Sequence, residues 1–330
     1  MTTPTPFDTL QQIAGGYGVA RCLHVAAELG VADRIDDAPR AVADVASDVG
    51  AHAESLKRVL RLLGAHGIFE VRDDTVGHSA ASRLLRTDHP QSMRSFVRMI
   101  GMPTNWSIYG ALEHAVRSGR PAAEHVLQGS YWGHFESDPE DARVFNAAME
   151  AKARGQVAAV VAVYDFGGAA TIGDIGGGRG HLLRAVLDAA PGARGVLFDL
   201  PRVVNDLTAL ASDRLTLQPG DFFHDALPAC ELYMLMEVIH DWNDDDALRI
   251  LQAVRRAAPP QARVLLLETM ISDAPGPDWA KMLDIHMLAL LGGLQRTRQE
   301  YAHLLEGAGF TLRRQIDTRA GISILEAVAA

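Results

Sequence analysis

The second half of the chain alternates between short apolar runs and longer amphipathic segments, and this rhythm severely restricts the possible folds. From residue 171 onward, the runs TIGDI, GVLFDL, LTLQPGDFF, ELYMLMEVI and RVLLLET alternate with segments of helical periodicity such as HLLRAVLDAA and DDDALRILQAVRRAA. Such alternation specifies a mostly parallel sheet covered by helices on both faces. Two further runs, TLRRQIDT and GISILEAVAA, are predicted to close the sheet through a turn at Ala320-Gly321. Residues 166–330 are therefore predicted to form a doubly wound α/β domain.

Residues 1–165 contain mainly helical patterns and are predicted to form a separate domain. Apolar residues recur at helical spacing over residues 10–29 and 56–63, and residues 41–49 predict a short helix. The string IFEVRDDTVGHS then holds two short extended runs, so a hairpin is expected. A helix pair followed by a hairpin is the outline of a winged helix, and that shape often binds DNA. A DNA-binding regulator that senses a ligand is therefore one alternative, although the apolar periodicity of AESLKRVLRLLGAHG favours a packed helix.

Composition excludes several other classes of protein. The chain has 330 residues, 48% of them hydrophobic, and a net charge of -10. An acidic balance disfavours nucleic acid as a partner, because polyanion binding relies on a positive field. Cys22 and Cys230 are too few and too far apart for a disulfide scaffold or a zinc site, so reduced thiols in a cytoplasmic protein are expected. No signal peptide or membrane span is expected either, and the apolar run 282–294 is predicted to be a buried helix.

A glycine-rich turn follows the first predicted strand of the sheet and opens a helix. The string GDIGGGRGHLL allows a sharp turn and a close approach of ligand to backbone, and the helix behind it offers free amide protons. The dinucleotide fingerprint needs a small residue at its last glycine position, where this chain has His181. The loop of Gly176, Gly177 and Gly178 therefore suits an adenosine with an amino-acid tail better than a pyrophosphate.

The next two strands also end in residues that suit a nucleoside. Asp199, in FDLP, can accept hydrogen bonds from both ribose hydroxyls, although a helix cap is the alternative. In GDFF, Asp221 can accept from an adenine amino group and Phe222 can stack on the ring, although an ordinary turn explains this string equally well.

A histidine and a glutamate end two later strands, which are predicted to be neighbours. His240 follows ELYMLMEVI and Glu268 ends RVLLLE. Phenols ionise near pKa 10, so on the order of one in a thousand is ionised at neutral pH, and a general base with a pKa near 7 removes this handicap. Glu268 is expected to orient the imidazole and stabilise its cation. The alternative is a histidine with a structural role only.

The motifs together resemble one family. DIGGGRGH, FDLP, GDFF, HDW, GG-x-x-RT and E-x-x-x-L-L-E-x-A-G-F occur in its order and spacing. The whole chain resembles the S-adenosylmethionine-dependent methyltransferases typified by plant caffeic acid and flavonoid O-methyltransferases, and it is most similar to their bacterial relatives that methylate phenolic or polyketide natural products. The resemblance implies a Rossmann-like methyltransferase sheet and an N-terminal helical, winged-helix-like domain that dimerises and helps to close the partner's substrate pocket. It also implies S-adenosylmethionine as cofactor and a hydroxyl of a small aromatic molecule as acceptor.

The resemblance also assigns roles to residues. His240 matches the catalytic base, and Glu268 matches one of two acids that flank it. The second acid is replaced by Gln295, which can hydrogen-bond but carries no charge. Residues matching the cofactor site are Gly176, Gly177, Gly178, Asp199, Asp221, Phe222 and Met236, the last where many plant members have lysine. Residues matching the acceptor walls are Trp132, Phe145, Asn146, Met149, Asp284, His286 and Met287, for which plain core packing is the alternative.

Two alternatives keep the cofactor but change the chemistry. His240, Asp241 and His286 are one possible two-histidine, one-carboxylate metal site, which would serve methylation of carbon next to the carbonyl of an α-keto acid. The main interpretation includes no metal. The other alternative is methylation of nitrogen in a heteroaromatic molecule.

Overall fold

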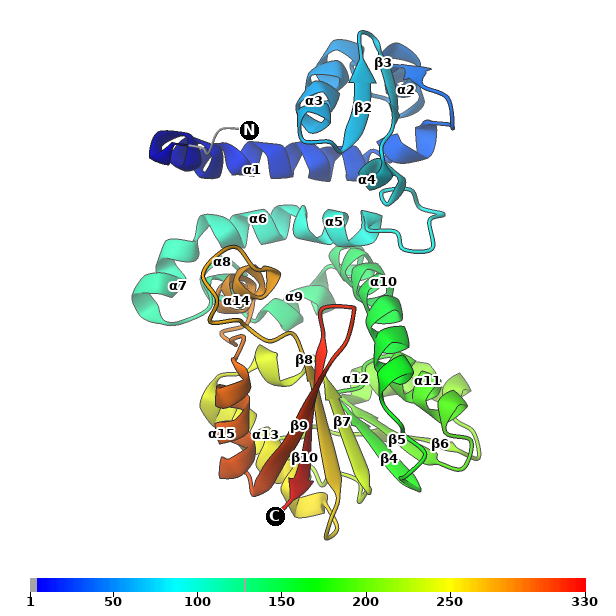
Figure 1. The fold of residues 1–330 in the computed structure, drawn as a ribbon, viewed down its shortest axis with the longest axis vertical. Coiled ribbons are helices and arrows are strands. Elements are labelled where there is room, and N and C mark those ends of the chain that lie inside the picture. Colours follow the sequence, from blue (N-terminus) through cyan, green and yellow to red (C-terminus); the bar gives the residue numbers. More distant parts are fainter. Residues whose placement is uncertain (1–4, 128) are drawn as a thin grey trace. The chain divides into compact units, whose positions relative to one another are not determined.

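The computed structural model describes residues 5–127 and 129–330 (Figure 1). These residues form two compact units, each made of two separate stretches of the chain. The first unit is made of the described residues of Met1–Ser107 and Trp132–Lys152, and the second of those of Ile108–Tyr131 and Ala153–Ala330. The units thus differ from the predicted single boundary after residue 165, because α7 (Leu112–Ser118) and α8 (Ala122–Leu127) pack on α14 (Trp279–Leu290) of the second unit.

The first unit confirms the predicted helix pair and hairpin. Its strands form a three-stranded antiparallel sheet in the order β1-β3-β2, with a turn at Asp73, whose φ is +50°. Its core is made by apolar residues of helical and alternating spacing, such as Val45, Leu60 and Phe69. The elements with residues in this unit are α1 (Pro6–Glu28), η1 (Val31–Arg34), β1 (Arg40–Ala41), α2 (Val42–Asp48), α3 (Ala53–Ala65), β2 (Phe69–Arg72), β3 (Thr75–His78), α4 (Ala80–Arg83), α5 (Arg94–Ile100), α6 (Pro103–Gly110), α9 (Tyr131–Ser137) and α10 (Pro139–Val163).

The N-terminal helix α1 starts at a strong cap and carries an exposed apolar stripe. Thr5 and Asp8 form a capping box, and Pro6 occupies the first turn, where a missing N–H costs nothing. Phe7, Leu10, Ile13 and Tyr17 follow one another at helical spacing, and each is at least 70% exposed. Contiguous exposed apolar surface of this kind marks an interaction site in many proteins.

The second unit contains the predicted doubly wound sheet. Its seven strands lie in the order β6-β5-β4-β7-β8-β10-β9; the first five are parallel and β10 runs antiparallel to both of its neighbours. Gly321, with a φ of +73°, lies in the predicted turn between the last two strands. The strands are β4 (Thr171–Ile175), β5 (Arg194–Asp199), β6 (Leu215–Pro219), β7 (Leu232–Met236), β8 (Arg263–Glu268), β9 (Phe310–Asp317) and β10 (Ser323–Ala329).

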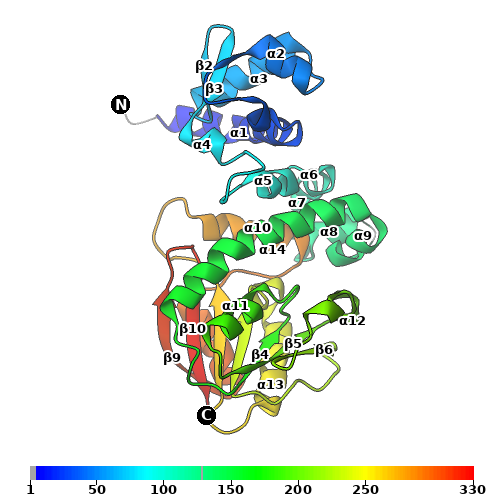
Figure 2. The same cartoon turned by 90° about the vertical axis from the view of Figure 1, so that its right-hand side faces the viewer.

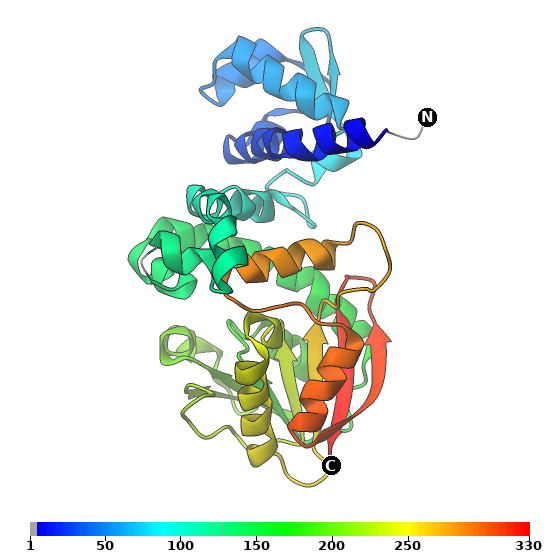
Figure 3. The same ribbon diagram turned by 90° about the vertical axis from the view of Figure 1, so that its left-hand side faces the viewer.

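Helices cover both faces of this sheet, as its alternation of patterns predicts. On one face, α13 (Asp244–Ala257) and α15 (Arg298–Gly307) bury residues such as Ile250 and Leu305 (Figure 3). On the other, α11 (His181–Ala189) and the end of α10 bury residues such as Leu183 and Val160 (Figure 2). Strands with two covered faces are apolar throughout, which explains why their runs show no polar alternation.

The apolar run 282–294 is mostly buried, as predicted, except at its start. The helix α14 ends at Leu290, and its first turns expose Trp279 and Met282 by 48% and 52%. The other described residues of the run are buried or half-buried. Within the part of the chain that the structure describes, no helix combines the length and the apolar character needed to cross a membrane.

Candidate active site

The glycine-rich turn after β4 is built from backbone that only glycine can supply. Gly176, Gly178 and Gly180 have φ values of +70°, +55° and +71°, the left-handed region that other residues avoid. A Cβ on Gly177 would lie 2.4 Å from Leu197 Cδ1, so this backbone passes directly against β5. The result is a tight cradle at the start of α11, at the carboxyl edge of the sheet.

Asp199 closes this cradle from the end of the next strand. Its Oδ2 accepts a hydrogen bond from the Gly178 N–H at 2.8 Å, and its Oδ1 accepts from the Leu200 N–H at 2.7 Å. Burial raises the pKa of this carboxyl even though both bonds favour its charged form. The helix α12 (Pro201–Val204) has Leu200 at its cap and no side-chain cap bond, so the capping alternative for Asp199 is not observed.

Asp174 belongs to the same site, and the sequence interpretation gave it no role. It lies in β4, is 1% exposed, and its Oδ2 has no hydrogen-bond partner among the described residues. Burial, with the nearby Asp199 carboxylate, raises its pKa to about 7. A buried, unpaired carboxylate oxygen beside the glycine turn suits a cationic group such as an ammonium. Its position before the glycines in DIGGG was the available signal.

Asp221 and Phe222 follow β6 and have different surroundings. The Asp221 carboxylate accepts from the Phe223 N–H at 2.8 Å and lies 2.9 Å from His224 Nδ1, as in an ordinary turn. Phe222 lies near Gly176, where a Cβ would come within 3.9 Å of its ring, and packs edge-on against Trp242 at 5.7 Å between centroids. The structure therefore brings Phe222 to the cradle, whereas an adenine contact of Asp221 stays a prediction.

Met236 ends β7, the strand next to β4. Its half-buried side chain packs against the apolar cluster of the face that α11 covers. It lies at the same edge of the sheet as the glycine turn, and its cofactor contact stays a prediction.

His240 is buried in a short turn, η3 (Ile239–Asp241), which follows β7. Its Nδ1 lies 2.8 Å from Gln295 Nε2 and 3.4 Å from Glu268 Oε2, and its Nε2 lies 3.3 Å from Asp241 Oδ1. Glu268 is the last residue of β8, and its Oε1 accepts from the Ile239 N–H at 2.9 Å. The structure thus brings together the three residues that the resemblance assigned to catalysis.

The charges around His240 make it a stronger base than an ordinary histidine. Burial lowers its pKa, but the carboxylates of Glu268, Asp241 and Glu237 outweigh that effect and raise the pKa to about 9. Burial in turn raises the pKa of Glu268 to about 7. The three carboxylates around the imidazole thus raise its pKa above the value near 7 that the sequence argument assumed.

The Gln295 amide decides which nitrogen of His240 carries its proton. With its NH₂ group on Nδ1, as in the structure, the imidazole proton sits on Nε2, and Gln295 Oε1 is buried without a partner among the described residues. With the amide turned by half a rotation, Oε1 accepts the Nδ1–H and the Nε2 lone pair is available. Only the second arrangement makes Nε2 a base.

Other acceptor-wall candidates of the second unit make different contacts. Asp284 Oδ1 accepts from the Gln295 N–H at 2.8 Å, so this carboxylate positions Gln295. His286 Nδ1 hydrogen-bonds the Tyr109 hydroxyl, and Met287 is buried. Whether these residues line an acceptor pocket stays a prediction.

The metal alternative is not supported by the geometry. His240, Asp241 and His286 do not form a group of close ligand atoms, and His286 pairs with Tyr109 instead. Across the described parts of the chain, the one group of three such residues is His134, Asp138 and Asp141, in the first unit. There the Asp138 side chain accepts from two backbone N–H groups at the start of α10, which explains its position without an ion.

Two of the four candidates of the first unit form an aromatic pair. Trp132 and Phe145 pack edge-on, with ring centroids 5.6 Å apart, and Met149 packs against the apolar cluster that contains Met99. Asn146 is exposed. These contacts agree with core packing for the three apolar residues, and a role in acceptor binding stays a prediction.

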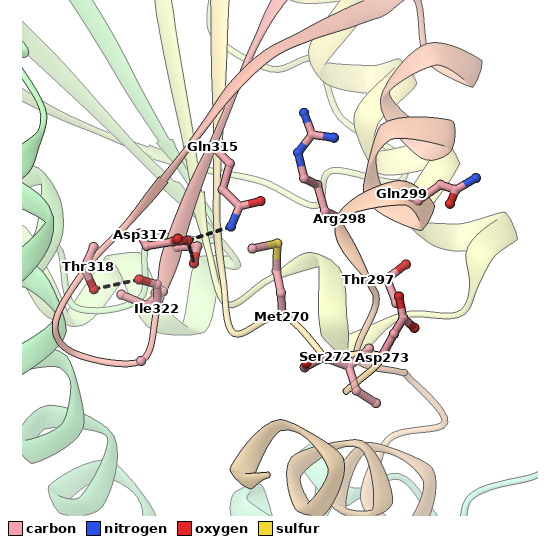
Figure 4. A pocket seen from close by; sticks show the side chains of 13 residues that line it. Met270, Ser272, Asp273, Thr297, Arg298, Gln299, Gln315, Asp317, Thr318 and Ile322 are labelled. Atoms are coloured by element: carbon pink, nitrogen blue, oxygen red, sulfur yellow. Dashed lines mark hydrogen bonds between the residues drawn. The ribbon is translucent and has the colours of Figure 1, made fainter. Parts of the chain in front are cut away.

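A hollow of about 510 Å³ lies beside the loop after β8 and the β9–β10 turn (Figure 4). Met270, Arg298 and Gln315 are among its walls, and Gln315 Nε2 donates to Asp317 Oδ1 at 2.6 Å. None of the described candidate residues lines it. This hollow is therefore separate from the candidate site.

Family comparisons agree with the architecture of both units. Residues 109–311 match the model of the O-methyltransferase domain, and residues 11–88 match the O-methyltransferase dimerisation domain. The first match covers more than half of the chain, so the chain belongs to this O-methyltransferase family. It is an O-methyltransferase with a dimerisation domain, and the two matches, which together cover most of the chain, favour an enzyme over a DNA-binding regulator.

Several known proteins resemble the chain along nearly all of its length. A phenazine O-methyltransferase of Lysobacter antibioticus is 38% identical over 96% of this chain and 95% of its own. The mitomycin biosynthesis 6-O-methyltransferase of Streptomyces lavendulae is 36% identical over 95% and 92%. The 8-amino-8-demethylriboflavin N,N-dimethyltransferase of Streptomyces davaonensis is 37% identical over 89% and 87%.

Solved structures of O-methyltransferases also resemble this chain over nearly all of its length. The mitomycin 7-O-methyltransferase has a TM-score of 0.89 at 36% identity, covering 98% of this chain and 97% of its own. An O-methyltransferase from neocarzinostatin biosynthesis, solved with S-adenosylmethionine and 2-hydroxy-5-methyl naphthoic acid, has a TM-score of 0.80 at 32% identity, covering 94% and 96%.

Proposed function

We propose that this enzyme transfers the methyl group of S-adenosylmethionine to a hydroxyl of a small aromatic molecule of the phenolic or polyketide type, with His240 as general base. The observation that carries the proposal is the buried His240 between Glu268 and Gln295, at the same edge of the sheet as the glycine turn. The names of the relatives, which act on aromatic natural products, support the choice of acceptor.

The residues present fit the cofactor. The glycine turn gives a close approach to backbone, Asp199 offers carboxylate oxygens for ribose hydroxyls, and the unpaired Asp174 Oδ2 suits an ammonium group. Phe222 beside Gly176 suits an aromatic base. When bound, S-adenosylmethionine supplies an electrophilic methyl group on a sulfonium.

His240 supplies the base that the acceptor requires. Its Nε2 takes the hydroxyl proton, while Gln295 Oε1 accepts the Nδ1–H and keeps this tautomer. A pKa of about 9 lies close to the value near 10 of a phenol, so the proton transfer is nearly balanced. The carboxylates of Glu268 and Asp241 stabilise the imidazolium that forms. Their effect is strong because the group is buried.

A panel of acceptors tests the proposal directly. The enzyme is incubated with isotopically labelled S-adenosylmethionine and with phenols, heteroaromatic amines and α-keto acids, and the products are analysed by mass spectrometry. We expect label on the oxygen of a phenol. Label confined to nitrogen would favour the chemistry named for the N,N-dimethyltransferase relative. Label on the carbon beside a keto group would contradict the proposal.

We also propose that the enzyme is a homodimer through the stripe of Phe7, Leu10, Ile13 and Tyr17 on α1. The match to a dimerisation domain and the exposure of this stripe support a second copy of the chain as the partner that covers the stripe. The double substitution Leu10→Asp and Ile13→Asp is expected to give monomers in light scattering, whereas Gln12→Asp, at an exposed position on the opposite face of the same helix, leaves dimers. A wild-type monomer at micromolar concentration would refute the dimer.

We further infer that the enzyme works in the cytoplasm. The argument is that Cys22 and Cys230 are both free thiols, as a reducing compartment keeps them.

A further inference from the structure

Arg296 is among the largest fully buried side chains of the described chain, and its guanidinium holds the turn that carries His240. Its Nη1 donates to the Ile239 carbonyl at 3.1 Å, and its Nη2 donates to the Trp242 carbonyl at 2.8 Å. These two carbonyls lie on either side of the pair His240 and Asp241. One side chain therefore grips the catalytic turn at both ends.

The positive charge of this guanidinium is paired with the carboxylate of Asp244. Both its Nε and its Nη2 lie within 2.9 Å of Asp244 Oδ1, at the start of α13. The Asp244 side chain is 70% exposed, whereas that of Arg296 is 0% exposed. A buried charge is costly unless hydrogen bonds satisfy it, and here they go to the turn, to Leu294 and to Asp244.

The neighbours of Arg296 in sequence hold the same turn. A Cβ on Gly293 would lie 2.1 Å from the His240 carbonyl oxygen, so the two backbones are in direct contact. Gln295 reaches His240 Nδ1, and its own N–H is fixed by Asp284. Residues 293–296 therefore form a clip on the turn, and Arg296 is the member that binds its carbonyls.

We propose that Arg296 is a positioning residue for methyl transfer, because its bonds to the carbonyls of Ile239 and Trp242 fix the direction in which the His240 imidazole points. The proposal rests on the proposed role of His240 as base. A lysine would keep the charge, but its compact ammonium lacks the planar fork that spans two carbonyls and a carboxylate. A misplacement of about 1 Å in a reacting group can cost on the order of 100-fold in rate.

The first test is Arg296→Lys in the full-length protein. With the phenol that the panel identifies, the single-turnover rate is expected to fall by about 10- to 100-fold, while the Kd for S-adenosylmethionine is unchanged. Arg214→Lys is the matched control, since Arg214 Nη1 also grips backbone carbonyls of the same unit, those of Leu187 and Pro191, at 3.0 and 3.2 Å. This control is expected to keep the wild-type rate below its unfolding temperature.

A milder variant keeps the test valid if Arg296→Lys does not fold. Asp244→Ala leaves the guanidinium in place but removes its carboxylate partner from an exposed position. We expect a smaller loss of rate in the same direction, whereas Asp245→Ala, the exposed neighbour on α13, keeps the wild-type rate. An unchanged rate in Asp244→Ala, with Arg296→Lys unfolded, would overturn the proposal.

A readout without any acceptor separates positioning from stability and from the proposed function. In protein labelled with ¹⁵N in its histidine rings, the His240 signals are assigned by their loss in His240→Ala. Arg296→Lys is expected to move these signals and to lower the pKa of His240 toward its ordinary value, because a looser turn weakens the contact with Glu268. Arg214→Lys is not. If Arg296→Lys and Asp244→Ala both leave the rate and the His240 signals unchanged, Arg296 has only a structural role. If His240→Ala stays active while the signals in Arg296→Lys move, the base assignment fails but the positioning contact stands.

Discussion

The turn after β4 and the turn after β7 lie at the same edge of one sheet, yet they are built in opposite ways. The first is a backbone structure, with three left-handed glycines and a fourth pressed against Leu197. The second is a side-chain structure, in which His240 depends on groups from β8 and from the segment after α14. The comparison teaches that cofactor binding here depends on backbone shape, whereas base strength depends on the charged side chains gathered around the imidazole. Substitutions should therefore separate the two properties.

The substitution His240→Ala is expected to separate catalysis from cofactor binding most strongly. We expect turnover to fall by about 10²- to 10⁴-fold, the usual contribution of a general base, because no other imidazole is held at this turn. Titration calorimetry should give the wild-type affinity for S-adenosylmethionine. His303→Ala, which removes an exposed imidazole from α15, is the control and should keep full activity. Loss of cofactor binding in His240→Ala would mean that the two turns are not independent.

Asp199→Ala should affect cofactor binding and leave the catalytic turn intact. Hydrogen bonds to a charged group contribute about 1.5–3 kcal/mol, so the Kd for S-adenosylmethionine should rise by about 10- to 100-fold. With saturating cofactor, turnover should recover most of its value. Asp206→Ala, at an exposed position in the 3₁₀ segment Asn205–Leu210, should change neither quantity. An unchanged Kd in Asp199→Ala would remove the ribose assignment.

The pH dependence of turnover should follow the charges around His240. A base must be neutral to accept a proton, so the rate should rise with pH along a limb centred near pH 9 and reach a plateau above it. Glu268→Gln removes the carboxylate that most raises this pKa, so the limb should move to lower pH by about one unit or more, and the plateau should fall about tenfold. A limb that stays in place would show that another group titrates.

The smallest effect is expected from Gln295→Glu. A carboxylate can only accept from Nδ1, so it would fix the tautomer with a free Nε2 and would raise the pKa of His240 further. The limb of the pH profile should move to higher pH, and the plateau above it should equal or exceed that of the wild type. A large drop of that plateau would mean that the amide NH₂ itself is required. Gln299→Glu, on the adjacent helix α15, is a suitable control.

The two turns also differ in how far the sequence alone predicts them. Gly176 to Gly178, Asp199 and Phe222 follow consecutive strands, so strand periodicity and a few neighbours were enough to place them. Glu268 was predicted from its place at the end of the strand next to that of His240, whereas Gln295 was assigned only through resemblance. The raised pKa of His240 was not foreseen, because it depends on how closely three carboxylates pack around one ring. Arg296 and Asp284 act through backbone groups on elements more than ten residues away, and no local pattern records such contacts.

The division of the chain shows the same limit. Residues 1–165 were predicted as one mainly helical domain, and this pattern did not show that α7 and α8 join the second unit, since an amphipathic stripe shows that a helix packs and not what it packs on. The contacts of α7 and α8 with α14 decide that question. Likewise, the pattern of the 282–294 run did not reveal that Met282, in the first turns of α14, is exposed.

The clip of residues 293–296 has a practical consequence for anyone who wishes to redesign this enzyme. It joins α14 at Asp284 to the catalytic turn at His240, with Gly293 leaving no room for a side chain between them. Exchanging α14 for that of another methyltransferase, in order to accept a new molecule, would therefore also alter the proton-transfer geometry unless Gly293, Gln295 and Arg296 travel with their anchor. With α14 as the predicted wall of the acceptor pocket, a change of acceptor would thus carry a change of reaction rate, and a graft should be cut after residue 296 rather than at the end of the helix.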